Sequence, residues 1–183
     1  MIELVLIKEN ELKMAYRMHR KGFIPTFLKY HDRNNPVFTT YKKFLSYFIS
    51  PNMHMYWIIY NGEAVGEIFV YIKDDFVKLA RIFILKKFQN KGIAQNAIKI
   101  AENLFTNNKR WCLNTIKEEK NNCHLYEKLG YKPTGKEKVI NKRMTVIDYE
   151  KFIDIEEKKL EINGMSIGFC SISKEEWQCM NTK

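Results

Sequence analysis

The stretch QNKGIA at residues 89–94 places amide and ammonium donors around a glycine, directly after an apolar run. The spacing of apolar residues after it predicts a helix from about Lys91 to Phe105. The first turn of a helix has unpaired backbone N–H groups and a partial positive charge. Gly92 would let an anion approach this backbone without meeting a Cβ. The stretch therefore indicates a pyrophosphate site, although a tight turn without a ligand can have the same residues.

The pattern differs from the two common nucleotide motifs. It has one glycine, so it is neither G-x-G-x-x-G nor G-x-x-x-x-G-K-[ST]. The strand expected before it closes an antiparallel meander, whereas a dinucleotide fold needs a parallel β-α-β unit at that place.

The elements that must position this stretch follow from periodicity and turn signals. Asn61-Gly62 between two β-rich runs predicts a hairpin. Gly22 and Pro25 are expected to interrupt the first helix, and residues 29–36 read as a loop. The expected strands are 2–7, 53–60, 63–73, 76–85, 110–116 and 139–150, and the expected helices are 9–21, about 40–50, 91–105 and 121–130. This order predicts an α+β fold, with a mixed, mostly antiparallel sheet flanked by helices.

Composition indicates a folded protein of one domain, with or without an appendage. The chain has 183 residues, of which 45% are hydrophobic and 28% charged. No apolar run approaches the roughly 20 residues of a membrane helix, and the first ten residues lack a basic leader. We therefore expect a cytoplasmic protein without a membrane partner. Four cysteines without a C-x-x-C pair, and only four histidines, predict free thiols and no metal site.

The net charge is +10, and residues 150–183 are slightly acidic, so the excess of basic residues lies before them. A basic body indicates an anionic partner, such as a phosphate-rich cofactor, an acidic substrate or a nucleic acid. A lysine-rich solvated surface would give the same charge. Nucleic acid is the less favoured partner, because no stripe of alternating basic and aromatic residues is present.

In two separate motifs, residues 89–94 and residues 125–131, the chain resembles the GCN5-related N-acetyltransferases, the GNAT superfamily. Residues 89–94 match its Q/R-x-x-G-x-G/A signature, and LYEKLGY at residues 125–131 resembles a second family stretch. The likeness covers about residues 2–150, including the order of the elements. It is nearest to a bacterial subgroup with an E-K-x-N-C-H-L-Y-E-K segment, which implies no substrate.

The resemblance implies the GNAT fold, acetyl-CoA as cofactor and CoA as product, with no metal. The pyrophosphate would lie against the start of the helix, and pantetheine would pair with the preceding strand like an additional strand. A backbone N–H near Phe83 or Ile84 would polarise the acetyl carbonyl. The implied cofactor-binding residues are Ile82, Phe83, Ile84, Leu85, Gln89, Asn90, Lys91, Gly92, Ile93, Ala94, Asn122, Leu125 and Tyr126.

The resemblance also implies a general acid, but it gives no general base. Tyr126 matches the tyrosine beside the thioester sulfur and would protonate the leaving thiolate. Many family members carry a glutamate on the strand before the pyrophosphate site, whereas residues 76–85 contain no acid after the turn. Glu119 is the leading replacement and Glu67 the second, with a water relay as the alternative.

The acceptor side is expected at the loop 29–36, where Asp32 could attract a cationic amine and Tyr30 could form a wall. The expected reaction is direct attack of a small-molecule primary amine on acetyl-CoA. A macromolecular amine, on a protein or an aminoacyl-tRNA, and a non-catalytic CoA-binding module stay open. We expect the acetyltransferase domain at 1–150 and an extension at 151–183 that contains a hairpin and a short helix. This extension would cover a sheet edge, contact a second subunit of a homodimer, or stay flexible.

Overall fold

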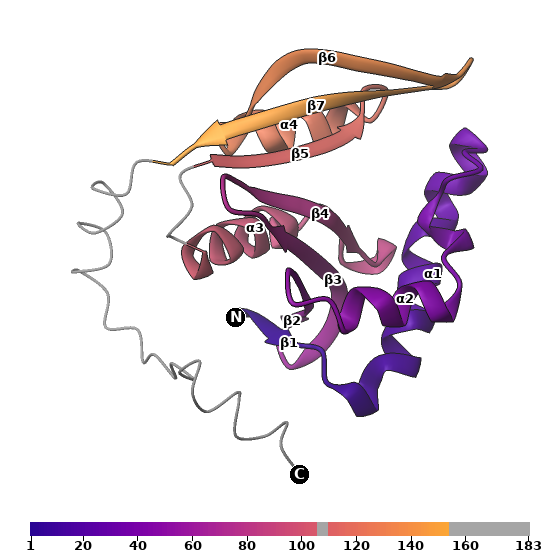
Figure 1. Cartoon of the computed structure of the whole chain (residues 1–183), viewed down its shortest axis with the longest axis vertical. Helices are drawn as coiled ribbons and strands as arrows, with labels where there is room; N and C mark the ends of the chain where they lie inside the picture. The colour runs from indigo at the N-terminus through magenta and orange to yellow at the C-terminus, as the bar shows by residue number, and fades with distance from the viewer. Residues whose placement is uncertain (106–109, 154–183) are drawn as a thin grey trace. The chain divides into compact units, whose positions relative to one another are not determined.

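One mixed sheet with the strand order β1-β2-β3-β4-β5-β7-β6 organises the fold (Figure 1). The computed structural model describes residues 1–105 and 110–153. All neighbouring strands among these are antiparallel, except that β4 and β5 run parallel. This confirms the predicted α+β fold. The hairpin and short helix expected after residue 153 lie outside the described residues.

The elements follow the predicted order. The strands are β1 (Ile2–Leu6), β2 (Met53–Tyr60), β3 (Glu63–Ile72), β4 (Val77–Ile84), β5 (Arg110–Ile116), β6 (Lys132–Asn141) and β7 (Met144–Phe152). The α-helices are α1 (Leu12–Tyr30), α2 (Tyr41–Phe48), α3 (Ile93–Leu104) and α4 (Lys120–Lys128), and short 3₁₀ turns occupy Glu9–Glu11, Pro36–Phe38 and Lys86–Phe88. The predicted Asn61-Gly62 turn is confirmed, because both residues have positive φ, 51° and 82°.

The helices cover the two faces of the sheet in pairs. α3 and α4 pack on one face, where buried residues such as Ile98 and Tyr126 share a cluster with Trp111 of β5. α1 and α2 pack on the opposite face, where Ala15 and Phe44 meet Phe69 of β3. Burying both faces removes large apolar side chains from water, which is the main favourable contribution to folding.

The predicted interruption of the first helix is wrong, because α1 continues through Gly22 and Pro25 to Tyr30. A proline inside a helix loses one backbone hydrogen bond, at roughly 3 kcal/mol. Tertiary packing offsets this loss. Tyr30 is 2% exposed at the end of the helix. Gly22 is where the helix lies closest to the sheet, since a Cβ there would meet the Phe83 ring at 2.3 Å.

The single late strand predicted over residues 139–150 is also wrong. The segment contains the end of β6, a turn and β7, which pair as a hairpin. The Asn141 side chain makes this turn by accepting a hydrogen bond from Arg143 N at 2.8 Å. An Asx turn of this kind needs no glycine. The sequence therefore lacked the usual hairpin signal.

Candidate active site

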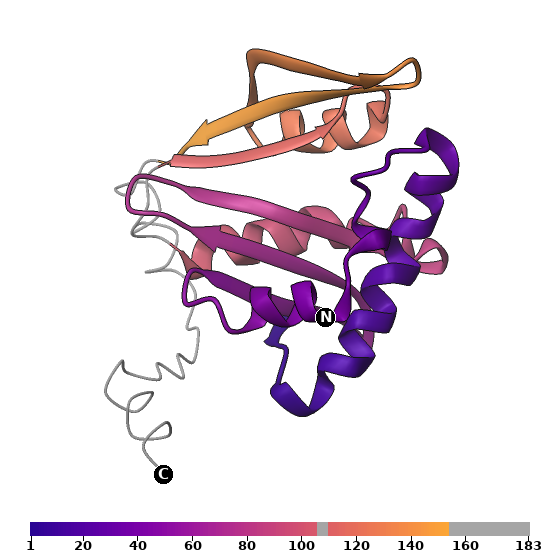
Figure 2. The same ribbon diagram turned by 45° about the vertical axis from the view of Figure 1, so that its right-hand side comes forward.

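β4 and β5 are neighbours over only the first part of β4. Their ladder ends where Leu79 meets Leu113. At the same point β4 has a β-bulge, in which Ala80 is the extra residue between the positions that Leu79 and Arg81 occupy opposite β3. A bulge bends its strand and increases the twist. We attribute the separation of the two strands, which is visible in Figure 2, to this bulge.

The second half of β4 presents backbone polar groups to the opening. Leu85 N donates to Val65 O at 2.8 Å, and successive residues of a strand direct these groups to opposite sides. The N–H and C=O groups of Ile82 and Ile84 therefore face away from β3, whereas those of Phe83 face it. Among the described residues, β5 does not pair with this part of β4. An extended ligand that contains amides can add to such an edge.

Two glycines allow Phe83 to sit where it does. A Cβ at Gly66 of β3 would meet the Phe83 carbonyl oxygen at 2.1 Å. A Cβ at Gly22 of α1 would meet the Phe83 side chain at 2.3 Å. Both distances are too short for any larger residue without movement. Local sequence patterns do not indicate this arrangement, because the three residues come from three separate elements.

The start of α3 has the features of an anion site. Gly92 is its N-cap residue with φ 72°, and Asn90 has φ 61°. No side chain caps this helix start, so its first backbone N–H groups are available to a ligand. The nearest atom that a Cβ at Gly92 would meet is Asn96 Nδ2 at 3.8 Å. The turn is therefore open in front of the backbone, and an anion can approach it.

The other residues of the 89–94 stretch divide between two roles. The Gln89 Nε2 group donates to Ile84 O at 2.8 Å, which ties the turn to the end of β4. Ile93 is 2% exposed and anchors α3 in the core. Ala94 packs partly against the same cluster. The Lys91 ammonium lies 5.7 Å from the centre of the Phe88 ring, on the surface. The backbone and the lysine, more than the glutamine amide, remain for an anionic group.

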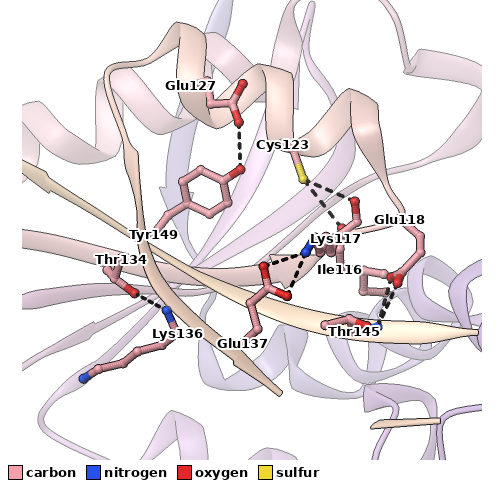
Figure 3. Close-up of polar contacts among 10 residues, drawn as sticks. All are labelled: Ile116, Lys117, Glu118, Cys123, Glu127, Thr134, Lys136, Glu137, Thr145 and Tyr149. Carbon is pink, nitrogen blue, oxygen red and sulfur yellow. Dashed lines mark hydrogen bonds and ion pairs between the residues drawn. The ribbon is translucent and has the colours of Figure 1, made fainter. Parts of the chain in front are cut away.

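α4 carries Tyr126 and is attached to the sheet by side chains. The Tyr149 hydroxyl of β7 donates to Glu127 at 2.8 Å, and the Glu118 carboxylate accepts from Thr145 N at 3.0 Å (Figure 3). The Cys123 thiol lies 3.8 Å from the carbonyl oxygens at the end of β5 (Figure 3). The Glu127 contact ties α4 to β7 and the Cys123 contacts tie it to the end of β5, so they hold the helix that carries Tyr126 against the sheet.

Tyr126 is 6% exposed, and its ring meets those of Tyr131 and Tyr149 at centroid distances of 6.1 and 6.3 Å. Its hydroxyl makes none of the side-chain hydrogen bonds among the described residues. Burial, with a smaller contribution from Cys123, raises the pKa of Tyr126 to about 12. The phenol therefore stays protonated at neutral pH. On the same helix Leu125 packs partly against the core, and Asn122 is exposed.

Glu119 lies between the end of β5 and α4, and it contacts the end of α1. Its Oε1 atom accepts hydrogen bonds from Lys29 Nζ and Tyr30 Oη, both at 2.7 Å. Burial raises the pKa of this carboxyl, but the bonds from Lys29 and Tyr30 outweigh burial and the pKa is lowered. Glu119 is 28% exposed, and both bonds fall on Oε1. Its Oε2 atom therefore remains able to accept a further hydrogen bond.

The two residues expected on the acceptor side help to build the loop after α1. Asp32 is 8% exposed, and its carboxylate accepts Asn34 N at 2.9 Å. The Tyr30 carbonyl accepts Asn141 Nδ2 from the β6–β7 turn at 3.0 Å. Sequence reasoning placed Tyr30 and Asp32 at a substrate pocket. That assignment stays a prediction, and the structure adds that Tyr30 bonds to Glu119 while Asp32 bonds within its own turn.

A buried pair that the sequence did not predict lies under α1. His19 Nδ1 is 3.1 Å from Glu67 Oε2, and their side chains are 0% and 1% exposed. The rings of Phe23, Phe44, Phe69 and Phe83 surround the imidazole. Burial raises the pKa of Glu67 well above its ordinary range, against the nearby Arg81 charge. Because Glu67 is almost inaccessible, an acceptor cannot contact it directly.

The described residues also set limits on other sites. In residues 1–105 and 110–153, no group of three or more His, Cys, Asp or Glu side chains could hold a metal ion. No helix in these ranges is long and apolar enough to cross a membrane. A pocket of about 200 Å³ lies on the outer face of β4, β5 and β7, with Lys78, Cys112 and Asn114 among its lining residues.

Solved structures with the same fold are acetyltransferases. The spermidine N-acetyltransferase from Vibrio cholerae, in complex with CoA and spermine, superimposes with a TM-score of 0.66 at 16% identity, over 82% of this chain and 95% of that one. The PaiA N-acetyltransferase from Thermoplasma acidophilum, in complex with coenzyme A, gives 0.68 at 14% identity, over 84% and 99%. A GNAT family acetyltransferase from Elizabethkingia anophelis with bound acetyl-CoA gives 0.60 at 17%, over 83% and 98%.

The fold and the opening in the sheet thus define an acyltransferase of the acetyl-CoA-dependent type. The family model described as the acetyltransferase (GNAT) domain matches residues 21–152, and the chain belongs to the GNAT acetyltransferases. No curated protein matches the sequence closely. The resemblance drawn from residues 89–94 and 125–131 is confirmed at the level of the family, and the subgroup is not specified.

Proposed function

We propose that the protein transfers the acetyl group of acetyl-CoA to a primary amine of a small molecule by direct attack. One observation carries this proposal: the unpaired edge of β4 at Ile82–Ile84 leads directly into the uncapped start of α3 at Gly92. An amide-containing arm can pair with the first and a diphosphate with the second. The solved relatives support the small acceptor, since one is a spermidine N-acetyltransferase in complex with spermine.

The residues present fit acetyl-CoA, which supplies an activated acetyl group and a thiolate leaving group when bound. The backbone of Ile82 and Ile84 would hold the pantetheine arm, and the Ile84 N–H is placed to polarise the acetyl carbonyl. One such donor contributes roughly 3 kcal/mol to transition-state stabilisation. The N–H groups at residues 92–94, with Lys91, would hold the diphosphate. Asn122 and Leu125 would contact the arm from α4.

Tyr126 acts as the general acid in this proposal. Its hydroxyl is protonated at neutral pH and has no competing partner among the described residues. It would donate its proton to the sulfur as the thiolate departs. General acid catalysis of this kind contributes roughly 10²- to 10⁴-fold to a rate.

Glu119 is the proposed proton acceptor for the incoming ammonium, through Oε2. Of the two glutamates expected as the base, Glu119 is 28% exposed, whereas Glu67 is 1% exposed. A lowered pKa makes Glu119 a weak base, so water would carry the proton onward to solvent. Tyr30 and Asp32 contribute by holding the loop after α1. We infer a catalytic domain close to residues 1–150, extended by the last residues of β7, with 151–183 otherwise outside it.

An amine panel with acetyl-CoA tests the proposal by measuring release of the free thiol of CoA. The expected result is turnover of at least one small primary amine, which falls about 100-fold in Tyr126→Phe and is kept in Tyr71→Phe. Tyr71 lies on β3 and serves as a matched control. Tight CoA binding without turnover of any amine would instead favour a non-catalytic CoA-binding module. Turnover of only a protein or an aminoacyl-tRNA, with the tRNA reaction weakened by salt, would favour a macromolecular acceptor.

A further inference from the structure

Arg81 places a positive charge on β4, the strand that carries a general-base glutamate in many family members. It follows the bulge residue Ala80 and lies opposite Phe69 of β3, beyond the last β4–β5 pair. Its side chain is half-buried on the face covered by α1 and α2. There its Nη2 donates to the Tyr47 hydroxyl at 3.1 Å, and its Cζ lies 4.6 Å from the centre of that ring. Stacking on Tyr47 orients the guanidinium.

Most donors of this guanidinium have no protein partner. A guanidinium has five N–H groups, and the described residues use one of them, in the bond to Tyr47. No carboxylate among the described residues forms an ion pair with Arg81. A half-buried and oriented arginine with free donors suits carboxylate and phosphate groups, which it can bind with two parallel hydrogen bonds.

Three acidic side chains on this side of the sheet already have partners. Glu67 is buried against His19, and Glu119 holds Lys29 and Tyr30 through one oxygen. The Asp32 carboxylate accepts a backbone N–H of its own turn. A polycation that approached Glu119 would also meet the positive charges of Lys29 and Arg81.

The positive charge of Arg81 acts on His19, which is buried between α1 and the sheet. Burial lowers the pKa of His19 to about 3, and the positive charge of Arg81 contributes to the same shift. An acceptor that approached from α1 and α2 would enter the same field. An anionic group on it would be attracted, and a second ammonium would be repelled.

We propose that the acceptor is an amine that also carries an anionic group, and that Arg81 binds this group. The inference rests on the proposed amine acetylation. The ammonium end would face Glu119 Oε2, and the anionic end would face the guanidinium. A carboxylate and a phosphate monoester share this chemistry, and matched substrates separate them.

The experiment compares amines that differ only in the anionic group. The carboxylate pairs are L-phenylalanine with phenethylamine and L-lysine with cadaverine, and the phosphate pair is phosphoethanolamine with ethanolamine. The expected result is a kcat/KM about 10- to 100-fold higher for the anionic member of at least one pair, as one charge-assisted hydrogen-bond pair would give. Arg81→Met should abolish this preference by raising the KM for the anionic amine. Arg81→Lys should keep part of the preference. Arg17→Met changes an exposed arginine of α1 and should keep all of it.

Equal or faster turnover of the amines without an anion, or of spermine, would overturn the anionic acceptor while the acetyltransferase proposal stood. Failure of all amines to react would count against the proposed function. In that case calorimetry with the CoA-loaded protein decides the inference separately. Binding of phosphoethanolamine or an amino acid that Arg81→Met weakens about tenfold supports it, and binding that is absent or independent of Arg81 rejects it.

Discussion

His19 Nδ1 lies 3.1 Å from Glu67 Oε2 in a pair that joins α1 to β3 beneath Phe83. Both side chains are buried, and burial favours the neutral form of each: it lowers the pKa of the imidazole to about 3 and raises that of the carboxyl. The pair therefore supports the strand that borders the opening, and it does so without a buried net charge.

Replacing Glu67 with glutamine should change how stability depends on pH. The folded protein keeps the Glu67 proton above pH 4.5, the ordinary pKa, while the unfolded chain loses it. Wild-type stability therefore falls as pH rises from 4.5 towards the raised pKa, by up to about 1.4 kcal/mol per pH unit. Glu67→Gln lacks this loss, so its free energy of unfolding minus that of the wild type should increase with pH.

Urea unfolding of both proteins at several pH values between about 4.5 and 8 measures this difference. His19 has the opposite dependence, since its stabilisation is gained as pH rises from about 3 to 6.5. Because His19 contacts Glu67, its contribution need not cancel below pH 6.5, whereas above that pH the imidazole is neutral in both the folded and the unfolded chain and the difference reports Glu67. Glu63→Gln, on the same strand but 56% exposed, is the control and should show a flat difference. A flat difference for Glu67→Gln as well would mean that the carboxyl is ionised in the fold.

Tyr126→Phe should lower kcat about 100-fold, in the middle of the range for a general acid. The affinity for CoA and the stability should change little, because the hydroxyl has no protein partner among the described residues. Stopped-flow turnover and calorimetry separate these quantities. Since the pKa of Tyr126 is about 12, the wild-type kcat should not decline through loss of this proton below about pH 10. An unchanged kcat in the variant would remove Tyr126 from the mechanism.

Gly92→Glu should abolish CoA binding, whereas Gly92→Gln should weaken it less. Both variants place a side chain on a residue with φ 72°, at a strain of roughly 1–2 kcal/mol. Only the glutamate adds a negative charge at the proposed diphosphate site. The difference between the two calorimetric affinities therefore isolates charge from strain. Equal affinities would argue that the diphosphate lies elsewhere.

Gly22→Ala and Gly66→Ala should each destabilise the protein by roughly 1–3 kcal/mol, as overpacking does. The first clash is with the Phe83 ring and the second with its carbonyl oxygen. Phe83→Ala removes the ring and leaves the carbonyl. In that background Gly22→Ala should become neutral or stabilising, since alanine favours a helix by about 1 kcal/mol. Gly66→Ala should remain destabilising, and denaturant unfolding of the three single and two double variants checks this reversal.

Lys29→Met should raise the pKa of Glu119, because the lysine hydrogen bond opposes the effect of burial. If Glu119 accepts the proton, kcat/KM of the wild type should rise with pH below about pH 4.5. In Lys29→Met this rise should occur at a higher pH. Glu119→Gln should lack that limb and react more slowly. A pH–rate profile that is the same in all three proteins would assign proton removal to water alone.

The sequence by itself determined most of the order of elements, the glycine turn before α3 and the family. These depend on local signals: periodicity, an Asn-Gly turn and a glycine at a helix start, each readable within a few residues. It failed at α1, where packing on Phe83 outweighs Gly22 and Pro25, and at the β6–β7 turn, where Asn141 replaces the usual glycine.

Only the tertiary structure decided what surrounds the opening between β4 and β5. Each of its features joins residues far apart in the chain: the β3–β4 bulge at Ala80, the His19–Glu67 pair, the bonds of Glu119 to Lys29 and Tyr30, and the Arg81–Tyr47 contact. Such contacts depend on how helices and strands pack across the sheet, and local sequence patterns do not encode that packing. The proposal for the cofactor side therefore rests on motifs, while the proposal for the acceptor side rests on the fold.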